Sequence, residues 1–145
     1  MKPMKSELAC LFPPEKTLAS MGQAQRRLVI ALRQCVMHGK ARSCPMRSIS
    51  LLLGGTGRGK AFLRIVREMG ESWPEPVRVL RPCSGKLTYD EALLIEMIDR
   101  AVHRDIAGFD KLLQDMLDRD RRSRLFGEIL AFAAAFIGPA PRHAV

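Results

Sequence analysis

Acidic residues are missing from a long part of this sequence. The stretch from Lys16 to Arg67 contains eleven Lys and Arg but no Asp or Glu, whereas Glu68 to Val145 contains eleven basic and thirteen acidic residues. The net charge of +9 therefore arises in the first half of the chain. Such an unbalanced positive charge favours a polyanionic partner, and nucleic acid is the most common one.

Cysteine is scarce, and its spacing points to no metal site. The four cysteines include no CxxC pair. A zinc site built from Cys35, His38, Cys44 and Cys83 would lack the short ligand spacings of structural zinc sites. Such cysteines are more often small core residues. We therefore expect no bound metal and no cofactor.

Long apolar runs are also missing. The longest, from Ile129 to Ile137, has about half of the roughly 20 residues that a membrane-spanning helix needs. The first 19 residues contain three prolines and no continuous apolar stretch, which is unlike a signal peptide. We expect a cytoplasmic protein with no membrane-spanning segment and no membrane partner.

The chain length fits one globular domain. Its 145 residues are 47% hydrophobic, which is enough to fill a core without cross-links. Residues 1–19 have mixed charge and no hydrophobic period, and we expect them to form a flexible N-terminal arm. We expect a single helical domain over residues 20–138 and a loose C-terminal end over residues 139–145.

Hydrophobic periodicity predicts helices along most of this domain. Ser20 and Gln23 resemble a capping box and Gly39 a left-handed stop, which together frame a helix from Met21 to His38. The segment Ser43–Leu53 fits either a short helix or a buried strand, because a short apolar run has no decisive period.

The later segments complete a helical pattern. A basic helix after Gly55 is expected to end at Gly70, and prolines make Glu71–Arg81 an extended connection or one short strand. Further helices are expected from Tyr89 after a Thr88–Glu91 capping box, from Asp105, and from about Ser123 after a charged turn at Asp118–Arg124. The sequence therefore predicts an all-α fold: a single compact bundle of five or six helices with at most one or two short strands.

The sequence GGTGRGK, from Gly54 to Lys60, matches a phosphate-binding P-loop in its glycines and its lysine. A P-loop also needs Ser or Thr after the lysine to hold magnesium, and Ala61 stands there. The several parallel strands of a P-loop domain are not predicted either. We therefore favour a glycine-rich turn between helices over phosphate contact, and phosphate contact over nucleotide hydrolysis.

A short helix, a glycine turn and a basic helix also outline a helix-turn-helix. Lys60, Arg64 and Arg67 fall on the side of their helix opposite its apolar stripe. The turn is longer than the usual three or four residues, and the outward face lacks the Asn, Gln or Ser that base reading uses. The competing interpretation is an ordinary surface helix with solvated arginines.

The first predicted helix has apolar residues on two sides. Ile30 and Met37 form a smaller second face among Arg26 and Arg33. This face either packs inside the domain or serves a protein partner or a second copy of the chain. Trp73, between two glutamates and a proline, is expected to anchor the connection by packing, and the alternative is an exposed ring that extends this interface.

Several spaced residues resemble a known family. The matching segments are Arg26–His38, Ser50–Gly54 with Gly57, Phe62–Arg64, Arg81–Cys83 and Leu87–Ala92. In these segments the chain is similar to small uncharacterised proteins from sphingomonads and related alphaproteobacteria, over roughly residues 20–136. The resemblance implies a bacterial, cytoplasmic accessory protein. It carries no activity, and Lys60 is not part of the shared pattern.

Together these observations predict a non-enzymatic regulatory module that contacts nucleic acid through a basic face. The candidate residues of this face are Arg26, Arg33, Arg58, Lys60, Arg64 and Arg67. The alternative is a protein-interaction module or homodimer that uses Ile30, Met37 and Trp73. No catalytic residues are assigned, because spacing alone assembles no titratable cluster.

Overall fold

The computed structural model describes residues 17–137 and confirms an all-α bundle over this range. It has six α-helices there and, in place of a strand, one isolated β-bridge between Thr17 and Lys86. The elements are a 3-10 helix η1 (Leu18–Ser20), α2 (Gln23–Lys40), α3 (Met46–Leu53), α4 (Thr56–Ser72), α5 (Tyr89–Val102), α6 (Ile106–Leu113) and α7 (Arg119–Ile137). None of the helices among these residues is both long and apolar enough to span a bilayer.

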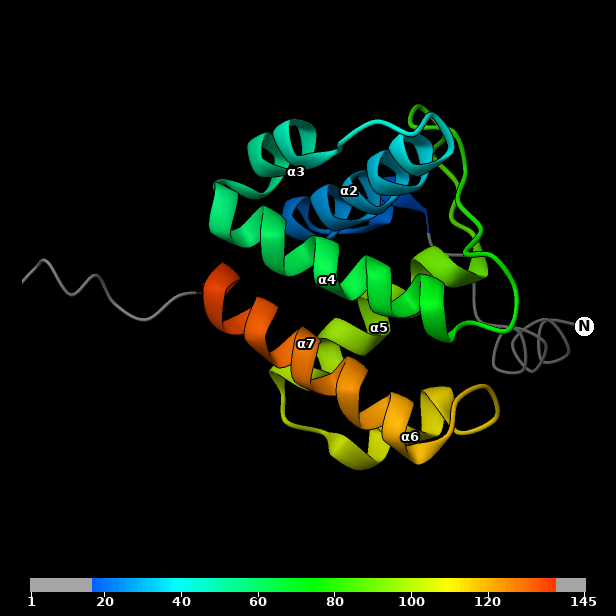
Figure 1. The fold of residues 1–145 in the computed structure, drawn as a ribbon. Helices are drawn as coiled ribbons and strands as arrows, with labels where there is room; N and C mark the ends of the chain where they lie inside the picture. The colour runs from blue at the N-terminus through cyan, green and yellow to red at the C-terminus, as the bar shows by residue number, and fades with distance from the viewer. Residues whose placement is uncertain (1–16, 138–145) are drawn as a thin grey trace, which may run out of the picture.

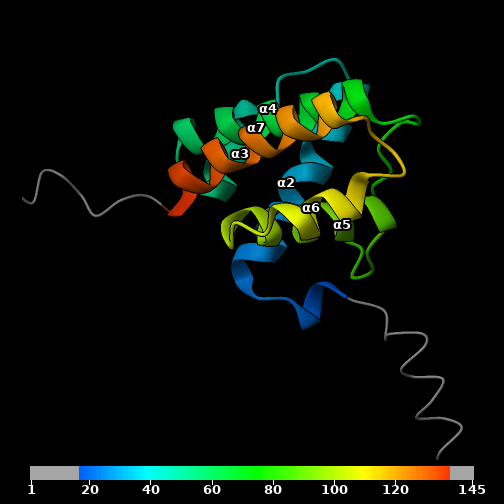
Figure 2. The ribbon, with the colours of Figure 1, turned by 90° about the horizontal axis from the view of Figure 1, so that it is seen from below.

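Helix α4 lies at the centre of the bundle (Figure 1). It packs against α7 and α3, while α2 contacts α3 and α5, and α5 contacts α6 and α7. Figure 2 shows α4 and α7 side by side, with α5 next to α6. Edge-to-face ring pairs join these helices. The ring centroids of Phe62 on α4 and Phe132 on α7 lie 5.6 Å apart, and those of Phe109 on α6 and Phe126 on α7 lie 4.9 Å apart.

The start of the described fold differs from the prediction. Ser20 does not cap α2; its hydroxyl oxygen accepts the Thr17 N–H at 3.1 Å in a capping box of η1, and the Ser20 N–H donates in return to Thr17 Oγ1 at 3.3 Å. The N-cap of α2 is Gly22, which offers no side chain. Residues 17–19, predicted as part of the arm, belong to the fold, because the Leu18 N–H donates to the Gly85 carbonyl oxygen at 2.9 Å. The structure does not describe residues 1–16 and 138–145. The remainder of the predicted N-terminal arm and the predicted loose C-terminal end therefore lie outside the described range.

The end of α2 also lies elsewhere than predicted. The helix continues through Gly39 to Lys40, and the left-handed residue is Arg42, with a φ of 56°. The Ser43 N–H donates to the His38 carbonyl oxygen at 2.8 Å, which turns the chain towards α3.

Helices α3 and α4 form a tight hairpin. The segment that fitted a helix or a strand is helix α3, and Gly54, with a φ of 86°, ends it in the left-handed conformation that favours glycine. Only Gly54 and Gly55 separate the two helices, so the turn is shorter than predicted. The Gly59 N–H already donates to the Gly55 carbonyl oxygen at 3.0 Å. The GGTGRGK segment is therefore mostly helix, and the P-loop interpretation is wrong.

Gly59 has a packing role inside α4. A Cβ added there would lie 2.7 Å from Ser50 Oγ and 3.4 Å from Met46 Cε, both on α3. The backbones of the two helices approach closely because this position has no side chain. The glycine pattern of this segment thus serves a turn at Gly54 and Gly55 and a helix contact at Gly59.

Helix α4 does not end at Gly70 but continues to Ser72. The connection from residue 73 to residue 88 contains no helix, as expected from its prolines. Trp73 anchors its start, because the ring is buried and its Nε1–H donates to Asp90 Oδ1 at 3.1 Å.

The second half matches the predicted helices closely. Thr88 and Glu91 form the predicted capping box of α5, and the Asp105 carboxylate caps α6 by accepting the Gly108 N–H at 2.9 Å. Helix α7, however, begins at Arg119, because Asp118 Oδ1 accepts the Arg121 N–H at 2.9 Å. The predicted charged turn is thus mainly the first turn of α7.

Candidate nucleic-acid interface on the α3–α4 hairpin

An exposed basic stripe runs along α4. Lys60, Arg64 and Arg67 are all exposed, and helical spacing places them on one face. The buried residues Phe62 and Ile65 lie on the opposite side of the same helix. Within residues 17–137 none of the three cations has an ion pair or a hydrogen bond. Their charges are therefore open to an external anion.

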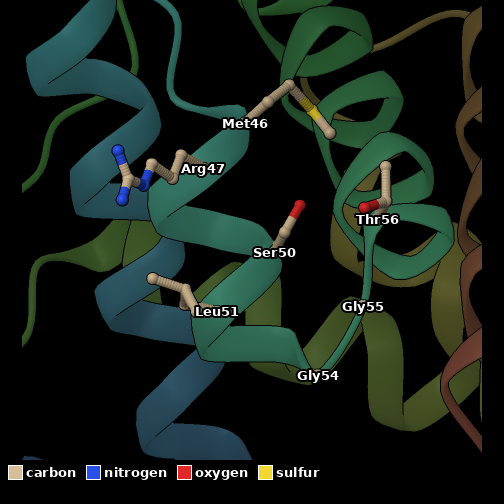
Figure 3. Close-up of a pocket in the computed structure, with 7 residues that line it drawn as sticks. All are labelled: Met46, Arg47, Ser50, Leu51, Gly54, Gly55 and Thr56. Carbon is tan, nitrogen blue, oxygen red and sulfur yellow. The ribbon is translucent and has the colours of Figure 1, made fainter.

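Arg47 on α3 adds a cation that was not among the predicted site residues. It is exposed and lines a hollow of about 590 Å³ over the hairpin turn, together with Thr56 (Figure 3). Met46 lines both this hollow and a second one that Arg67 borders. Arg47 on α3 and Arg67 on α4 therefore line two hollows that share Met46. The acid-free composition of this stretch was the signal that could have identified Arg47.

Arg33 is buried and does not belong to the basic face, so this predicted site residue is wrong. Its side chain is fully enclosed and pairs with the equally buried Glu91 of α5: Nε donates to Oε2 at 2.7 Å and Nη2 to Oε1 at 3.1 Å. This two-bond geometry matches the planar guanidinium to the carboxylate. The spacing of residues within α2 could not predict the pairing of Arg33 with Glu91, because Glu91 lies far away in the sequence.

The guanidinium of Arg33 also holds the connection before α5. Its Nη1 donates to the carbonyl oxygens of Arg81 at 3.1 Å and Ser84 at 2.7 Å, and its Nη2 to that of Lys86 at 2.6 Å. Glu91 in turn accepts the Leu80 N–H at 3.1 Å. The pair is therefore a structural joint between α2, α5 and the intervening connection.

Arg58 also serves the fold. It is half-buried, its Nη1 donates to the Leu53 carbonyl oxygen at 3.1 Å, and its Nε donates to the Ala135 carbonyl oxygen at 3.1 Å. These bonds satisfy carbonyl groups in the last turns of α3 and α7. Arg26, the remaining predicted cation, is half-buried near the start of α2 rather than on α4. The exposed basic face is therefore narrower than predicted.

The predicted apolar interface is also reduced. Trp73 is only 8% exposed and donates a hydrogen bond to Asp90, which confirms its packing role and removes it from the predicted interface. Ile30 is half-buried. Met37 is 44% exposed and is the one member of this set that is clearly accessible.

The second hollow of the hairpin is largely apolar. It has a volume of about 520 Å³ and lies between α2, the α2–α3 connection and α4. The buried thiol of Cys35 lines it, and burial raises the pKa of this thiol to about 12, so the thiol stays neutral and unreactive. Cys44, in contrast, is exposed at the same hollow.

Comparison with known proteins gives no function to transfer. Protein-family models, curated proteins and solved structures contain no match to this chain. Among residues 17–137, no three His, Cys, Asp or Glu side chains lie close enough together to hold a metal ion. The function must therefore follow from the charges and hollows of the chain's own surface.

Proposed function

We propose that this protein contacts the phosphate backbone of nucleic acid through the α3–α4 hairpin, using Arg47, Lys60, Arg64 and Arg67. The observation that supports this most strongly is the stripe of three exposed cations on α4, none of which has a partner among residues 17–137. A cation without an internal partner keeps its full charge for a ligand. Binding to phosphates releases condensed counterions, which is the main source of sequence-independent affinity.

The dimensions of the stripe suit a short stretch of backbone. From Lys60 to Arg67 the helix rises about 10 Å, at about 1.5 Å per residue. Arg47 on the neighbouring helix α3 is a fourth exposed cation. Four cations of this kind would neutralise three or four phosphates, so the logarithm of the affinity would fall with the logarithm of salt with a slope of roughly −2.7 to −3.6.

Backbone contact rather than base reading is proposed because of the residues available. Helix α4 contains no Asn or Gln, the side chains that pair with adenine. Phosphate contacts position a protein without selecting a sequence. We therefore propose a non-enzymatic accessory role, in which the protein binds many sites weakly and similarly.

The proposal extends to the setting of the protein. The resemblance to small proteins from sphingomonads and related alphaproteobacteria supports a bacterial protein that acts in the cytoplasm. Nucleic acid is accessible there, and this supports the choice of partner. Detection of the native protein bound to nucleic acid in fractionated cells would test this setting, and recovery only outside the cytoplasm would contradict it.

Two matched triple variants test the function. In the first, Lys60, Arg64 and Arg67 are each changed to Gln; in the second, Lys111, Arg119 and Arg124 of α6 and α7 are each changed to Gln. Both remove three exposed charges of the same sign from helices. The first variant should lose about 100-fold or more in affinity for a fluorescent duplex at low salt, whereas the second should lose less than about fivefold.

Equal losses in the two variants would mean that only net charge matters and would contradict a specific face. Circular dichroism and thermal unfolding of both variants serve as the folding control. Duplexes of different sequence should bind wild type within about threefold of each other, since phosphates carry no sequence information.

A second candidate function is self-association through α2. It is favoured by Met37, one of the few large apolar side chains that are exposed among the described residues. Sedimentation of wild type and Ile30→Asp tests it. A dimer that Ile30→Asp converts into a folded monomer would support it, and a wild type that remains monomeric at high concentration would end it.

A further inference from the structure

The hollow between α2, the α2–α3 connection and α4 combines an apolar wall with one charged group. Its wall includes Cys35, Pro45, Leu63 and Val66. Among the residues that the structure describes, Arg67 of the basic stripe is the only charged one in this lining. The volume of about 520 Å³ falls within the range of about 300–1,000 Å³ that is typical of small-molecule sites.

The charge of this hollow is unbalanced. All of its lining residues lie between Cys35 and Arg67, within the stretch that contains no Asp or Glu. Arg67 itself has no ion pair or hydrogen bond with residues 17–137. An apolar surface next to an uncompensated cation favours a ligand with an apolar body and an anionic end.

The single guanidinium of Arg67 indicates which kind of anion this hollow would bind. Its planar fork of N–H donors matches a carboxylate with two parallel hydrogen bonds. A doubly charged phosphate group would leave one charge uncompensated against a single cation. The apolar part of the ligand would meanwhile cover the surface of Leu63 and Val66, both of which are half-buried.

We propose that this hollow binds a small apolar monocarboxylate, with Arg67 holding the carboxylate and the wall of the hollow covering the hydrocarbon. Arg67 belongs to both the hollow and the basic stripe. Given the proposed function, a bound carboxylate competes with phosphate for this arginine and weakens contact with nucleic acid. The ligand thus acts as a regulator of the same face.

The exposed cysteines give a direct test that needs no nucleic acid. Cys44 lines the hollow, whereas Cys83 lies in the connection before α5, and both are exposed. Octanoate below its micellar concentration should slow alkylation of Cys44 by iodoacetamide about fivefold or more and leave Cys83 unchanged, because burial blocks thiolate access. Mass spectrometry of the alkylated peptides measures both rates in one sample.

Matched probes and variants identify the chemistry. Octan-1-ol and acetate each lack one half of the ligand and should protect Cys44 at least about tenfold less well. Arg67→Gln should weaken octanoate binding by about tenfold, while Arg64→Gln, which removes the same charge one turn away, should change it by less than about twofold. Equal protection by octan-1-ol, equal slowing of both cysteines, or no effect of Arg67→Gln would each overturn the site.

The regulatory step is tested separately. Octanoate should weaken duplex binding by wild type but not by Arg67→Gln, and should flatten the salt slope by about 0.9, which corresponds to one phosphate contact. Protection of Cys44 without any effect on duplex binding would leave the carboxylate site in place and overturn its coupling to nucleic acid. A protein that binds no duplex would contradict the proposed function, while the alkylation result would still decide the site.

Discussion

The helices α2 to α4, called the front helices, differ from the rear helices, α5 to α7, in two respects. The two groups differ in how their N-termini are capped and in whether their charged side chains have partners. The front helices begin without a side-chain cap and without an acidic residue in the first turn. In the rear, Thr88 caps α5 and Asp105 caps α6. Rear arginines also have carboxylate partners, such as Arg100 with Asp105 at 3.1 Å and Arg122 with Asp110 at 3.3 Å.

This difference shows that the front helices are not arranged for maximum stability. A side-chain cap typically contributes about 1 kcal/mol, and an acidic residue near a helix N-terminus adds about 0.3–1 kcal/mol. The front helices lack both contributions, and Lys60, Arg64 and Arg67 of α4 have no ion pair or hydrogen bond among the described residues. Uncapped N-termini and unpaired cations together raise the positive potential of the front helices.

One ion pair joins the two regions. Arg33 from the front and Glu91 from the rear are both fully buried and bind each other directly. Glu91 also belongs to the capping box of α5, so the same carboxylate starts a rear helix and neutralises a front cation. Breaking this pair is therefore the strongest test of how the front helices depend on the rear helices.

The largest expected effect comes from Glu91→Gln. This change leaves the Arg33 charge buried without a counter-charge, and the free energy of unfolding should fall by about 3–5 kcal/mol. Urea denaturation followed by circular dichroism measures it. The control Asp110→Asn removes the partly exposed partner of Arg122 and should cost less than about 1 kcal/mol.

If Glu91→Gln does not fold, a double variant keeps the prediction testable. Replacing Arg33 by Met and Glu91 by Leu removes both charges and should be more stable than either single replacement. If the double variant loses as much unfolding free energy as the two single variants together, Arg33 and Glu91 do not stabilise the fold as a pair.

Crowding of the front hairpin should have the next largest effect. Gly59→Val would push a side chain into Ser50 and Met46, and should lower the free energy of unfolding by about 1–3 kcal/mol. Gly57→Val is the matched control, because nothing lies within 4 Å of its added Cβ. Thermal unfolding of both variants decides the matter, and equal melting temperatures would refute close packing at Gly59.

The buried thiol of α2 predicts a smaller effect that depends on pH. Burial raises the pKa of Cys35 from its ordinary value of 9.0 to about 12 in the folded protein. The thiol therefore stabilises the fold fully below its ordinary pKa, and this contribution is lost as pH rises towards the folded value. Between about pH 8 and pH 10 wild type should lose about 1 kcal/mol more than Cys35→Ala. If wild type and Cys35→Ala show the same dependence of unfolding free energy on pH in urea denaturation, this prediction is contradicted.

Adding a cap to the front should have the smallest effect. Gly22, the N-cap of α2, has the extended conformation of an N-cap and open space around its added Cβ. Gly22→Asp should raise the free energy of unfolding by about 0.5 kcal/mol through a side-chain cap and the helix dipole. Differential scanning calorimetry measures the shift, and a lower melting temperature would show that α2 does not start as described.

Local signals were enough to predict much of the fold. The Thr88–Glu91 capping box and the Asp105 cap lie within four residues of the helices they start, so the sequence contains the whole interaction. The opposite faces of α4 follow from helical spacing alone. The exposed stripe of Lys60, Arg64 and Arg67 was therefore predictable.

Interactions distant in sequence account for the errors. The sequence places Arg33 on the basic face because its partner Glu91 lies on α5, and it leaves an exposed Trp73 open as an alternative because its partner Asp90 is equally remote. The glycines of GGTGRGK suggested a loop, yet Gly59 lies inside a helix because α3 packs against it. Sequence spacing cannot distinguish a glycine needed for a turn from one needed for close packing.

The central claim is that the α4 stripe is an open cationic face, and its most direct test is a salt titration. Duplex affinity of wild type and of the variant with Lys60, Arg64 and Arg67 changed to Gln is measured by fluorescence anisotropy across a range of ionic strength. Wild type should give a slope of roughly −2.7 to −3.6 and the variant a slope up to about 2.7 units shallower, since three phosphate contacts are lost. A flat response of wild type, or parallel slopes for the two proteins, would contradict the account.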